Sequence, residues 1–412
     1  MEKRKYSNPI IKGFYPDPSI CKANDKYYIV TSSFEYFPGI PIFESSDLIN
    51  WNQIGHCLTR ETQLNLKNSP NSKGIYAPTI RYYKDVFYVI VTNVTTNENF
   101  IVTTKDPTKG WSDAVVIQDW NGIDPSLYFE GNRMFIQGNA EQYVDTLGIY
   151  QAELDPTTFQ LITERTLICK GTGGKAPEAP HVFKKGEYYY LLMAEGGTEY
   201  GHMVTIFRSK NIFGPYESSS NNPILTHRSI RNEIQCVGHA DILEDSSGYW
   251  WLVCLGVRSK GSHSYYHHLG RETFLTPIDW NEDGWPVVNR DGKIYIEMEG
   301  PLEREQKTKS NNLDIKFDKQ LLDYDRLIFL RNPNFSNYRI IEKSLYLYGS
   351  EGTLNDDEEV SFVGIRQSEF NVSYQTTFHL NNTTDTVFGI TTYMSNNYHY
   401  DVTIDSKIEN YV

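Results

Sequence analysis

The chain has 412 residues, more than one ordinary domain holds, and its 39 Lys and Arg against 52 Asp and Glu give a net charge of −13. This acidity argues against a nucleic acid or an anionic membrane as partner, because both bind basic surfaces. Aromatic residues make up 14% of the chain, beside 29 glycines and 18 prolines. That composition is typical of many short strands joined by turns.

The N-terminus and the cysteines indicate in which cellular compartment the protein is expected. The five cysteines are widely spaced and form no Cys-x-x-Cys pair, which argues against a zinc site or a disulfide framework. The basic N-terminus is followed by an apolar stretch too short for a signal peptide, and no apolar run of about eighteen residues occurs. We therefore expect a soluble, cytoplasmic protein.

Five segments between residues 17 and 253 share one layout: a small or proline-bearing start, an apolar residue, a short turn, and a run of aromatic and β-branched residues. Their starts are Asp17-Pro18-Ser19-Ile20, Ala77-Pro78-Thr79-Ile80, Asp124-Pro125-Ser126-Leu127, Ala179-Pro180-His181-Val182 and His239-Ala240-Asp241-Ile242. Each predicts a hairpin with room for two further strands. Five such sheets arranged radially bury the faces that one sheet leaves exposed, so the repeat predicts a five-bladed β-propeller over residues 1–300. A β-sandwich with similar hairpins is the alternative.

The sequence changes character after residue 300. Residues 301–319 are charged and polar, which predicts a linker. In residues 320–412, four segments alternate apolar with polar side chains, as half-exposed antiparallel strands do; they are 338–348, 360–365, 372–380 and 387–393. The predicted fold class is therefore all-β, a five-bladed propeller followed by a truncated, partial β-sandwich domain.

The register of the repeat also predicts a site. Equivalent positions at one mouth of the propeller channel hold Asp17, Ala77, Asp124, Ala179 and His239, with Glu178 beside the fourth. Converging carboxylates suit general acid–base catalysis. Alternatively, Asp17 and Asp124 are Asp-Pro turn residues, Glu178 lies on a surface loop, and His239 is a metal ligand, a substrate contact or a core residue. The shared register favours catalysis.

These residues lie in motifs that resemble the β-xylosidases of glycoside hydrolase family 43. The resemblance rests on residues 8–19 and 31–39, and on the motifs Gly74-Ile75-Tyr76-Ala77-Pro78, Gly122-Ile123-Asp124-Pro125-Ser126, Glu178-Ala179-Pro180-His181, Gly238-His239-Ala240 and Leu269-Gly270-Arg271-Glu272-Thr273. It covers essentially the whole chain. The family's five-bladed propeller agrees with the fold that the repeat predicts independently.

The resemblance implies roles for seven residues. Asp17 would be the general base, Glu178 the general acid, and Asp124 the carboxylate that orients the acid and keeps its pKa high, in an inverting reaction. Arg271 would contact the sugar in the terminal subsite, with Phe34 and Tyr76 as aromatic walls and His239 nearby. Blade packing is the alternative for both aromatic residues. No cofactor is required, but some relatives hold a divalent cation such as calcium near a histidine that resembles His239.

We therefore expect an exo-acting β-xylosidase that releases D-xylose from the non-reducing end of short β-1,4-xylo-oligosaccharides. An α-L-arabinofuranosidase or a bifunctional enzyme is the close alternative, and a non-catalytic carbohydrate-binding propeller or an inactive product is the alternative from another class. Retaining sucrose- and fructan-cleaving enzymes are disfavoured, because neither an Asn-Asp-Pro-Asn nor an Arg-Asp-Pro motif occurs. The family's sandwich continues past the equivalent of Val412, so we expect a shortened domain to affect stability and the homo-oligomeric state.

Overall fold

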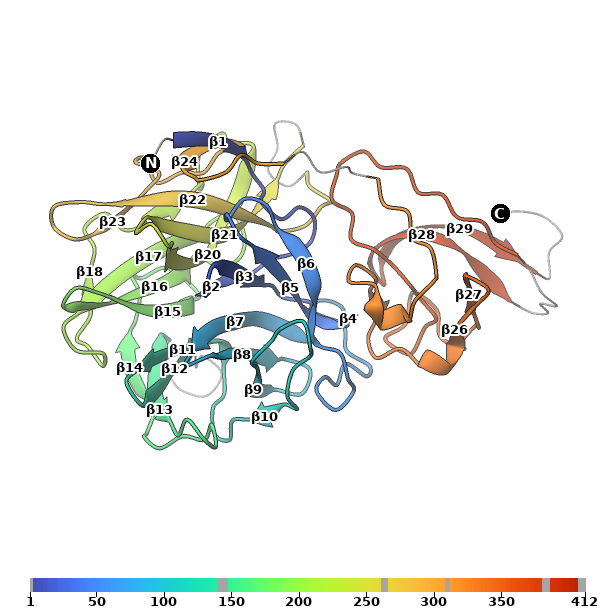
Figure 1. The fold of residues 1–412 in the computed structure, drawn as a ribbon, viewed down its shortest axis with the longest axis horizontal. Coiled ribbons are helices and arrows are strands. Elements are labelled where there is room, and N and C mark those ends of the chain that lie inside the picture. Colours follow the sequence, from blue (N-terminus) through green and yellow to red (C-terminus); the bar gives the residue numbers. More distant parts are fainter. Residues whose placement is uncertain (1–2, 140–146, 261–265, 308–311, 380–385, 407–412) are drawn as a thin grey trace.

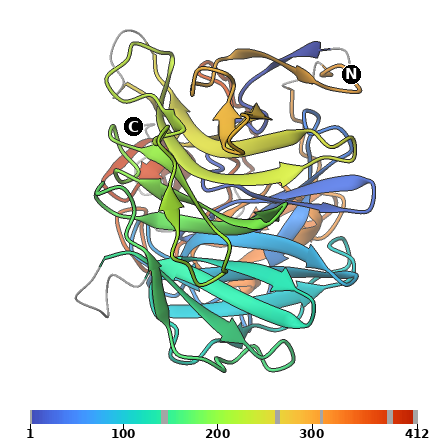
Figure 2. The same ribbon diagram turned by 90° about the vertical axis from the view of Figure 1, so that its left-hand side faces the viewer.

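The computed structural model describes residues 3–139, 147–260, 266–307, 312–379 and 386–406. Figure 1 shows a large body of β-sheets, coloured blue to yellow, beside a smaller β domain in orange and red. In Figure 2, which looks from the side of the large body, the smaller domain lies behind it. The helices of the described ranges are two single 3-10 turns, η1 (Leu321–Asp323) and η2 (Phe335–Asn337), and none of these ranges contains a helix able to cross a membrane.

The large body is a five-bladed β-propeller, which confirms the prediction from the repeat. Each blade is an antiparallel sheet whose strands follow chain order outward from the axis. Blade I contains β2 (Ser19–Ala23), β3 (Lys26–Val30), β5 (Gly39–Ser45) and β6 (Asn52–Leu58); blade II contains β7 (Ile75–Tyr83), β8 (Val86–Asn93), β9 (Glu98–Thr104) and β10 (Val115–Val116). Blade III contains β11 (Ile123–Glu130), β12 (Arg133–Asn139), β13 (Ile149–Leu154) and β14 (Thr166–Cys169). Blade IV contains β15 (Glu178–Lys185), β16 (Tyr188–Glu195), β17 (Met203–Ser209), β18 (Glu217–Ser218) and β19 (Leu225–Thr226); blade V contains β20 (Ile234–Glu244), β21 (Trp250–Arg258), β22 (Glu272–Trp280) and β23 (Pro286–Val288).

The N-terminal segment closes the ring. Strand β1 (Lys3–Ser7) pairs antiparallel with β24 (Glu297–Pro301), and the dark blue and orange strands lie together in Figure 1. The Tyr6 hydroxyl donates a hydrogen bond of 2.9 Å to the carbonyl oxygen of Leu275 in blade V. Tyr6 also belongs to a buried cluster that includes Trp51, which directly precedes β6 of blade I, and Trp251 of blade V. The first residues thus fill the seam between the first and last blades. The domain limits 1–300, 301–319 and 320–412 stay predictions.

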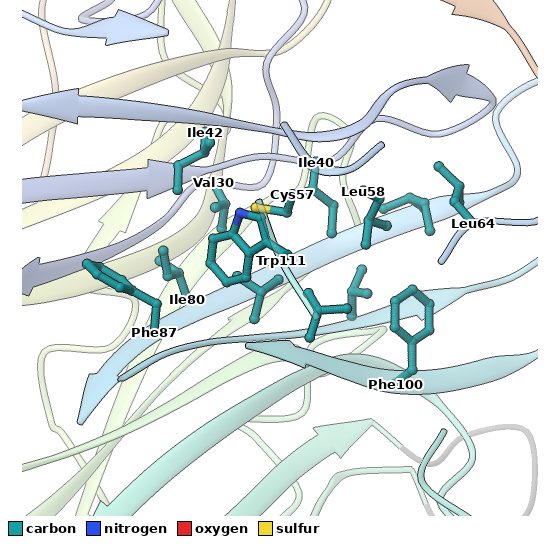
Figure 3. Close-up of a cluster of buried hydrophobic side chains, with 14 of the residues drawn as sticks. Val30, Ile40, Ile42, Cys57, Leu58, Leu64, Ile80, Phe87, Phe100 and Trp111 are labelled. Carbon is teal, nitrogen blue, oxygen red and sulfur yellow. The ribbon is translucent and has the colours of Figure 1, made fainter. Parts of the chain in front are cut away.

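A second buried cluster joins blades I and II. Figure 3 shows Val30, Ile42, Ile80 and Phe87 around the ring of Trp111. These strands carry apolar residues toward both neighbouring blades, which explains why their sequences are continuous apolar runs rather than alternating ones. The cluster extends into the smaller domain through Phe329 and Tyr338.

The smaller domain is attached at the loop that connects β3 to β5. Strand β25 (Phe329–Leu330) pairs antiparallel with β4 (Tyr36–Phe37), which lies in that loop. The Arg331 amide donates a hydrogen bond of 2.7 Å to the Glu35 carbonyl oxygen. The preceding residue, Phe34, exchanges backbone hydrogen bonds of 3.0 and 3.1 Å with Ile75 of blade II, so the smaller domain is attached one residue beyond a predicted site residue.

The β-sandwich domain contains two hairpins among its described residues. They are β26 (Tyr338–Ile341) with β27 (Ser344–Leu347), and β28 (Val387–Ser395) with β29 (Tyr398–Asp405). The predicted single strand 338–348 is therefore a hairpin. The predicted strands 360–365 and 372–380 are wrong for their described residues: Gly364 makes one bridge to Ile328, and 372–379 form no strand. Alternation yields a strand only where a neighbour takes its backbone hydrogen bonds, and 372–379 are exposed throughout. Leu380 lies outside the described residues.

Candidate active site

The five register-equivalent residues share one backbone conformation. All have a positive φ, with values of 57° for Asp17, 31° for Ala77, 54° for Asp124, 51° for Ala179 and 46° for His239. In blades II to V the strand register shifts at this point, as at a β-bulge. The alanines adopt the same conformation as the carboxylates, so the blade architecture sets the backbone. At this position the blades differ only in the side chain that each one carries.

Asp17 is buried and held as an anion. Its Oδ2 accepts a hydrogen bond of 2.5 Å from the Ser32 hydroxyl, which itself accepts one of 2.7 Å from the Ala77 amide. Its Oδ1 lies 3.3 Å from Nη1 of Arg271. Burial alone would raise the pKa of Asp17, but Arg271, His239 and the Ser32 hydrogen bond together hold it below its usual value. Asp17 is therefore ionised and can accept a proton.

The surroundings of Asp124 shift its pKa in the opposite direction from that of Asp17. Its Oδ2 accepts a hydrogen bond of 3.1 Å from the Ala179 amide of the next blade. Burial, together with the negative charges of Glu178 and Asp17, raises the pKa of Asp124 well above its usual value. The carboxyls of Asp124 and Glu178 thus keep a proton between them while Asp17 is ionised. Such a separation of pKa values is the condition for acid–base catalysis.

His239 lies between the two aspartates. Its Nδ1 is 3.7 Å from Oδ1 of Asp17 and 3.9 Å from Oδ2 of Asp124, and burial lowers its pKa. Across the described ranges, no three His, Cys, Asp or Glu side chains are arranged to hold a metal ion. The divalent cation that the family resemblance implies near His239 stays a prediction.

Glu178 is the first residue of β15, and its preceding loop is held from two sides. Asn139 donates a hydrogen bond of 2.6 Å to the carbonyl oxygen of Pro177. The buried Glu195 carboxylate accepts bonds from the amides of Thr172, at 2.8 and 3.0 Å, and Gly174, at 3.0 Å. The two prolines around Glu178 and these bonds fix where the carboxyl can lie.

Aromatic rings and a guanidinium border Asp17. The rings of Phe34 and Tyr76 lie 5.4 Å apart edge to face, and Phe14 stacks on Phe34 at 5.3 Å. The guanidinium of Arg271 lies 5.3 Å from the centre of the Phe34 ring. Its Nη1 also donates a hydrogen bond of 3.2 Å to the Thr198 hydroxyl. The structure therefore brings Asp17, Asp124, His239, Arg271, Phe34 and Tyr76 together, with Glu178 beside Asp124.

Four further residues of this site were not singled out by the sequence. Ser32 and Phe14 lie within the motifs quoted above, so their neighbourhood was marked although their contacts were not. Thr198 and His202 lie on the connection from β16 to β17, where no motif or repeat position marks them. The Nε2 of His202 is 4.0 Å from Oε1 of Glu178. Only the sheet order β15-β16-β17 and the packing of β17 against β20 reveal that contact.

Comparison with known proteins identifies the family. Residues 6–286 match Glycosyl hydrolases family 43, and residues 314–412 match the Beta xylosidase C-terminal Concanavalin A-like domain. The chain belongs to glycoside hydrolase family 43. It is accordingly a β-xylosidase-like glycoside hydrolase, and inversion of the anomeric configuration is characteristic of the family.

Several family 43 proteins are similar over most of this chain. A non-reducing end alpha-L-arabinofuranosidase of Bacteroides ovatus is 40% identical over 90% of this chain and 70% of its own. A xylosidase/arabinosidase of Butyrivibrio fibrisolvens is 40% identical over 88% of this chain and 72% of its own. The structure of a xylan beta-1,4-xylosidase from Bacillus halodurans has a TM-score of 0.84 at 33% identity, covering 99% of this chain and 83% of its own. The family is therefore shown, while the sugar preference differs among the relatives.

Proposed function

We propose that this glycoside hydrolase is an exo-acting β-xylosidase that releases D-xylose from the non-reducing end of short β-1,4-xylo-oligosaccharides. The observation that carries the proposal is the contrast between two carboxyl environments: the pKa of Asp17 is lowered by Arg271, while burial and the charge of Glu178 raise the pKa of Asp124. One base and one acid at the same channel mouth suit single-displacement hydrolysis. The xylosidase names among the relatives support xylose as the sugar.

In the proposed reaction, Asp17 removes a proton from a water molecule that attacks the anomeric carbon. Glu178 gives its proton to the departing glycosidic oxygen at the same time, so the bond to the leaving sugar breaks and the anomeric configuration inverts. Asp124 holds Glu178 in the protonated state until the proton is needed. Inverting enzymes keep base and acid roughly 6.5–9.5 Å apart to leave room for the water. Arg271 binds sugar hydroxyls beside Asp17, against the Phe34 ring.

Substitution of the two carboxylates tests these roles. We expect Glu178→Ala to lose most activity on xylobiose but to retain much of it on a dinitrophenyl xyloside, because a good leaving group needs no proton. Asp17→Ala should lose activity on both substrates. The opposite pattern would exchange the acid and the base. If the unsubstituted chain and both variants had equal residual rates, the protein would be a non-catalytic carbohydrate-binding propeller.

An α-L-arabinofuranosidase is the second candidate. It is favoured by the Bacteroides ovatus relative, which carries that name at 40% identity. Rates on nitrophenyl β-xyloside and nitrophenyl α-arabinofuranoside, measured on one preparation, distinguish the two. A large excess on the arabinofuranoside would replace our first choice, and comparable rates would make the enzyme bifunctional. A cytoplasmic location and a homo-oligomer stay predictions, which cell fractionation and light scattering would test.

A further inference from the structure

His202 has a ring nitrogen aimed at the Glu178 carboxyl. The residue lies just before β17 and is only 1% exposed. Its Nδ1 is 3.0 Å from the carbonyl oxygen of Cys236. A carbonyl oxygen only accepts hydrogen bonds, so Nδ1 carries a proton. In the neutral ring, Nε2 is then a bare acceptor. This Nε2 is buried without a hydrogen-bond partner among the described residues, and Oε1 of Glu178 lies 4.0 Å away.

The direction of this ring is fixed by its surroundings. A Cβ atom at Gly238 would lie 2.5 Å from three atoms of the imidazole, so the ring packs directly against the glycine backbone. The Thr226 hydroxyl donates a hydrogen bond of 2.9 Å to the His202 carbonyl oxygen. Gly238 is therefore required for space, and the ring keeps Nε2 turned toward Glu178.

The charges around His202 favour its neutral form. Burial, His239 and Arg271 lower its pKa to about 4, against the opposing effects of the Cys236 carbonyl and Asp17. A lone pair on a neutral ring attracts a protonated carboxyl, which can donate a hydrogen bond, and repels a carboxylate. Two neighbouring carboxyls resist ionising together, and the charge of Glu178 raises the pKa of Asp124 on blade III. A small rotation of the Glu178 side chain would bring Oε1 into hydrogen-bond distance of Nε2.

We propose that His202 is a positioning residue that holds Glu178 in its protonated, proton-donating form through an Oε1–H···Nε2 hydrogen bond. The inference rests on the proposed function, because it assumes that Glu178 is the general acid. It assigns His202 no direct contact with the sugar. The bond breaks when Glu178 turns its proton toward the glycosidic oxygen.

Two substitutions separate the acceptor from the packing role. His202→Asn keeps a polar group near the Cys236 carbonyl but places no acceptor at Glu178, whereas His202→Gln can place an amide oxygen where Nε2 lies. We expect His202→Asn to lower kcat on xylobiose about tenfold, with little loss on a dinitrophenyl xyloside. The alkaline limb of kcat/KM should move to lower pH, and His202→Gln should restore part of both effects.

His227→Asn is the matched control. This histidine is also fully buried and has its Nδ1 2.7 Å from the carbonyl oxygen of Ile234, but its Nε2 accepts from the Ile294 amide. We expect His227→Asn to affect both substrates equally. An equal loss on both substrates in His202→Asn, with an unmoved alkaline limb, would overturn the proposal. Glu178→Ala in the same assay distinguishes failure of the proposed function from failure of the His202 role. If Glu178→Ala loses equal activity on both substrates, Glu178 is not the general acid and the proposed function itself fails.

A second measurement applies if the His202 variants do not fold. In nitrogen NMR of the unsubstituted protein, labelled on histidine, the His202 signal should show the neutral tautomer with the proton on Nδ1. A proton on Nε2 of the neutral ring, or a charged ring at pH 7, would contradict the proposal.

Discussion

Ser32 connects the catalytic aspartate of one blade to the backbone of the next. Its hydroxyl lies between the Ala77 amide and the Asp17 carboxylate, and all three groups are buried. Asp124 is bound by the Ala179 amide in the same way, but without an intervening side chain. In both cases the alanine of the following blade supplies an N–H group, which stabilises negative charge on the preceding carboxylate. The two alanine blades are thus part of the site through their backbone.

Removal of the Ser32 hydroxyl should change the pH dependence of catalysis. Asp17 must be ionised to act as base, so activity falls as the pH drops through its pKa. Ser32→Ala removes a hydrogen bond to the ionised form and therefore raises that pKa. We expect the acid limb of kcat/KM to move to higher pH by about one unit. Ser33→Ala is the control, because Ser33 binds the Ile40 amide instead. An unmoved acid limb in Ser32→Ala would contradict this account.

The sequence predicted some of these residues by register and others only by resemblance. Asp17, Asp124 and His239 were found because the repeat places them at one position of successive blades. Arg271 and Phe34 lie outside that register and followed from family motifs alone. His202 could not be predicted, because its contact with Glu178 depends on how the sheet of β15, β16 and β17 packs against β20. A single buried histidine in a sequence carries no information about which carboxyl it faces.

The pairing of β4 with β25 attaches the sandwich domain to the loop that bears Phe34. Glu35 lies at this junction and is only 3% exposed. Burial raises its pKa to about 7, although its hydrogen bonds and the positive charges of Arg331 and Arg366 act against this. The guanidinium of Arg366 lies 4.9 Å from the Tyr15 ring and 5.6 Å from the Tyr36 ring. A titratable group is therefore enclosed where the two domains meet.

Glu35 should make the stability of the protein depend on pH. Its pKa is about 7 when folded and near its usual 4.5 when unfolded. Between these values the unfolded chain binds fewer protons, so this group's contribution is full below pH 4.5 and lost by about pH 7. Glu35→Gln removes the ionisation. The difference in free energy of unfolding between variant and parent should then rise with pH, by on the order of 3 kcal/mol. Urea denaturation at several pH values measures it, with Glu61→Gln as the exposed control; a constant difference would contradict the prediction.

The sequence predicted elements marked by their own residues, such as turns, better than strands that depend on a distant pairing partner. The short turn of the repeat layout is formed by Asn24-Asp25 in blade I and by Lys84-Asp85 in blade II, between the first two strands of each blade. The wrong strands at 360–365 and 372–379 had the alternation but no local partner. Glu342 and Lys343, both with positive φ, form a hairpin turn that divides the expected strand 338–348. Neither residue is a common turn former, which explains why the division was missed.

At the scale of the molecule, the propeller depends on the seam between its first and last blades. Tyr6 packs edge to face against Trp251 at 6.3 Å and is 2% exposed. The five contiguous blades each form their own sheet, so this seam holds the ring together without a strand shared between blades. The catalytic residues come from blades I, III, IV and V, and an opened ring would separate them.

Tyr6→Ala should therefore impair both stability and activity. Loss of a buried aromatic side chain destabilises by about 3–5 kcal/mol, which should lower the midpoint of thermal unfolding clearly. Tyr6→Phe is the matched control: it loses only the hydrogen bond to Leu275, worth about 1 kcal/mol. Calorimetry and xyloside hydrolysis near the unfolding midpoint measure the two effects. If Tyr6→Ala and Tyr6→Phe had the same midpoint of thermal unfolding, packing at the seam would not limit the stability of the protein.

The pairing of β1 with β24 also has a consequence for synthesis on the ribosome. Residues 3–7 are translated almost 300 residues before their partners, residues 297–301. At about 5–20 residues per second, β1 waits roughly 15–60 s with an unpaired edge. Blades I to IV can form during that interval, each from its own stretch of nascent chain. The catalytic centre is complete only after blade V, which supplies His239 and Arg271, has been made, and the seam closes later still, when β24 meets β1.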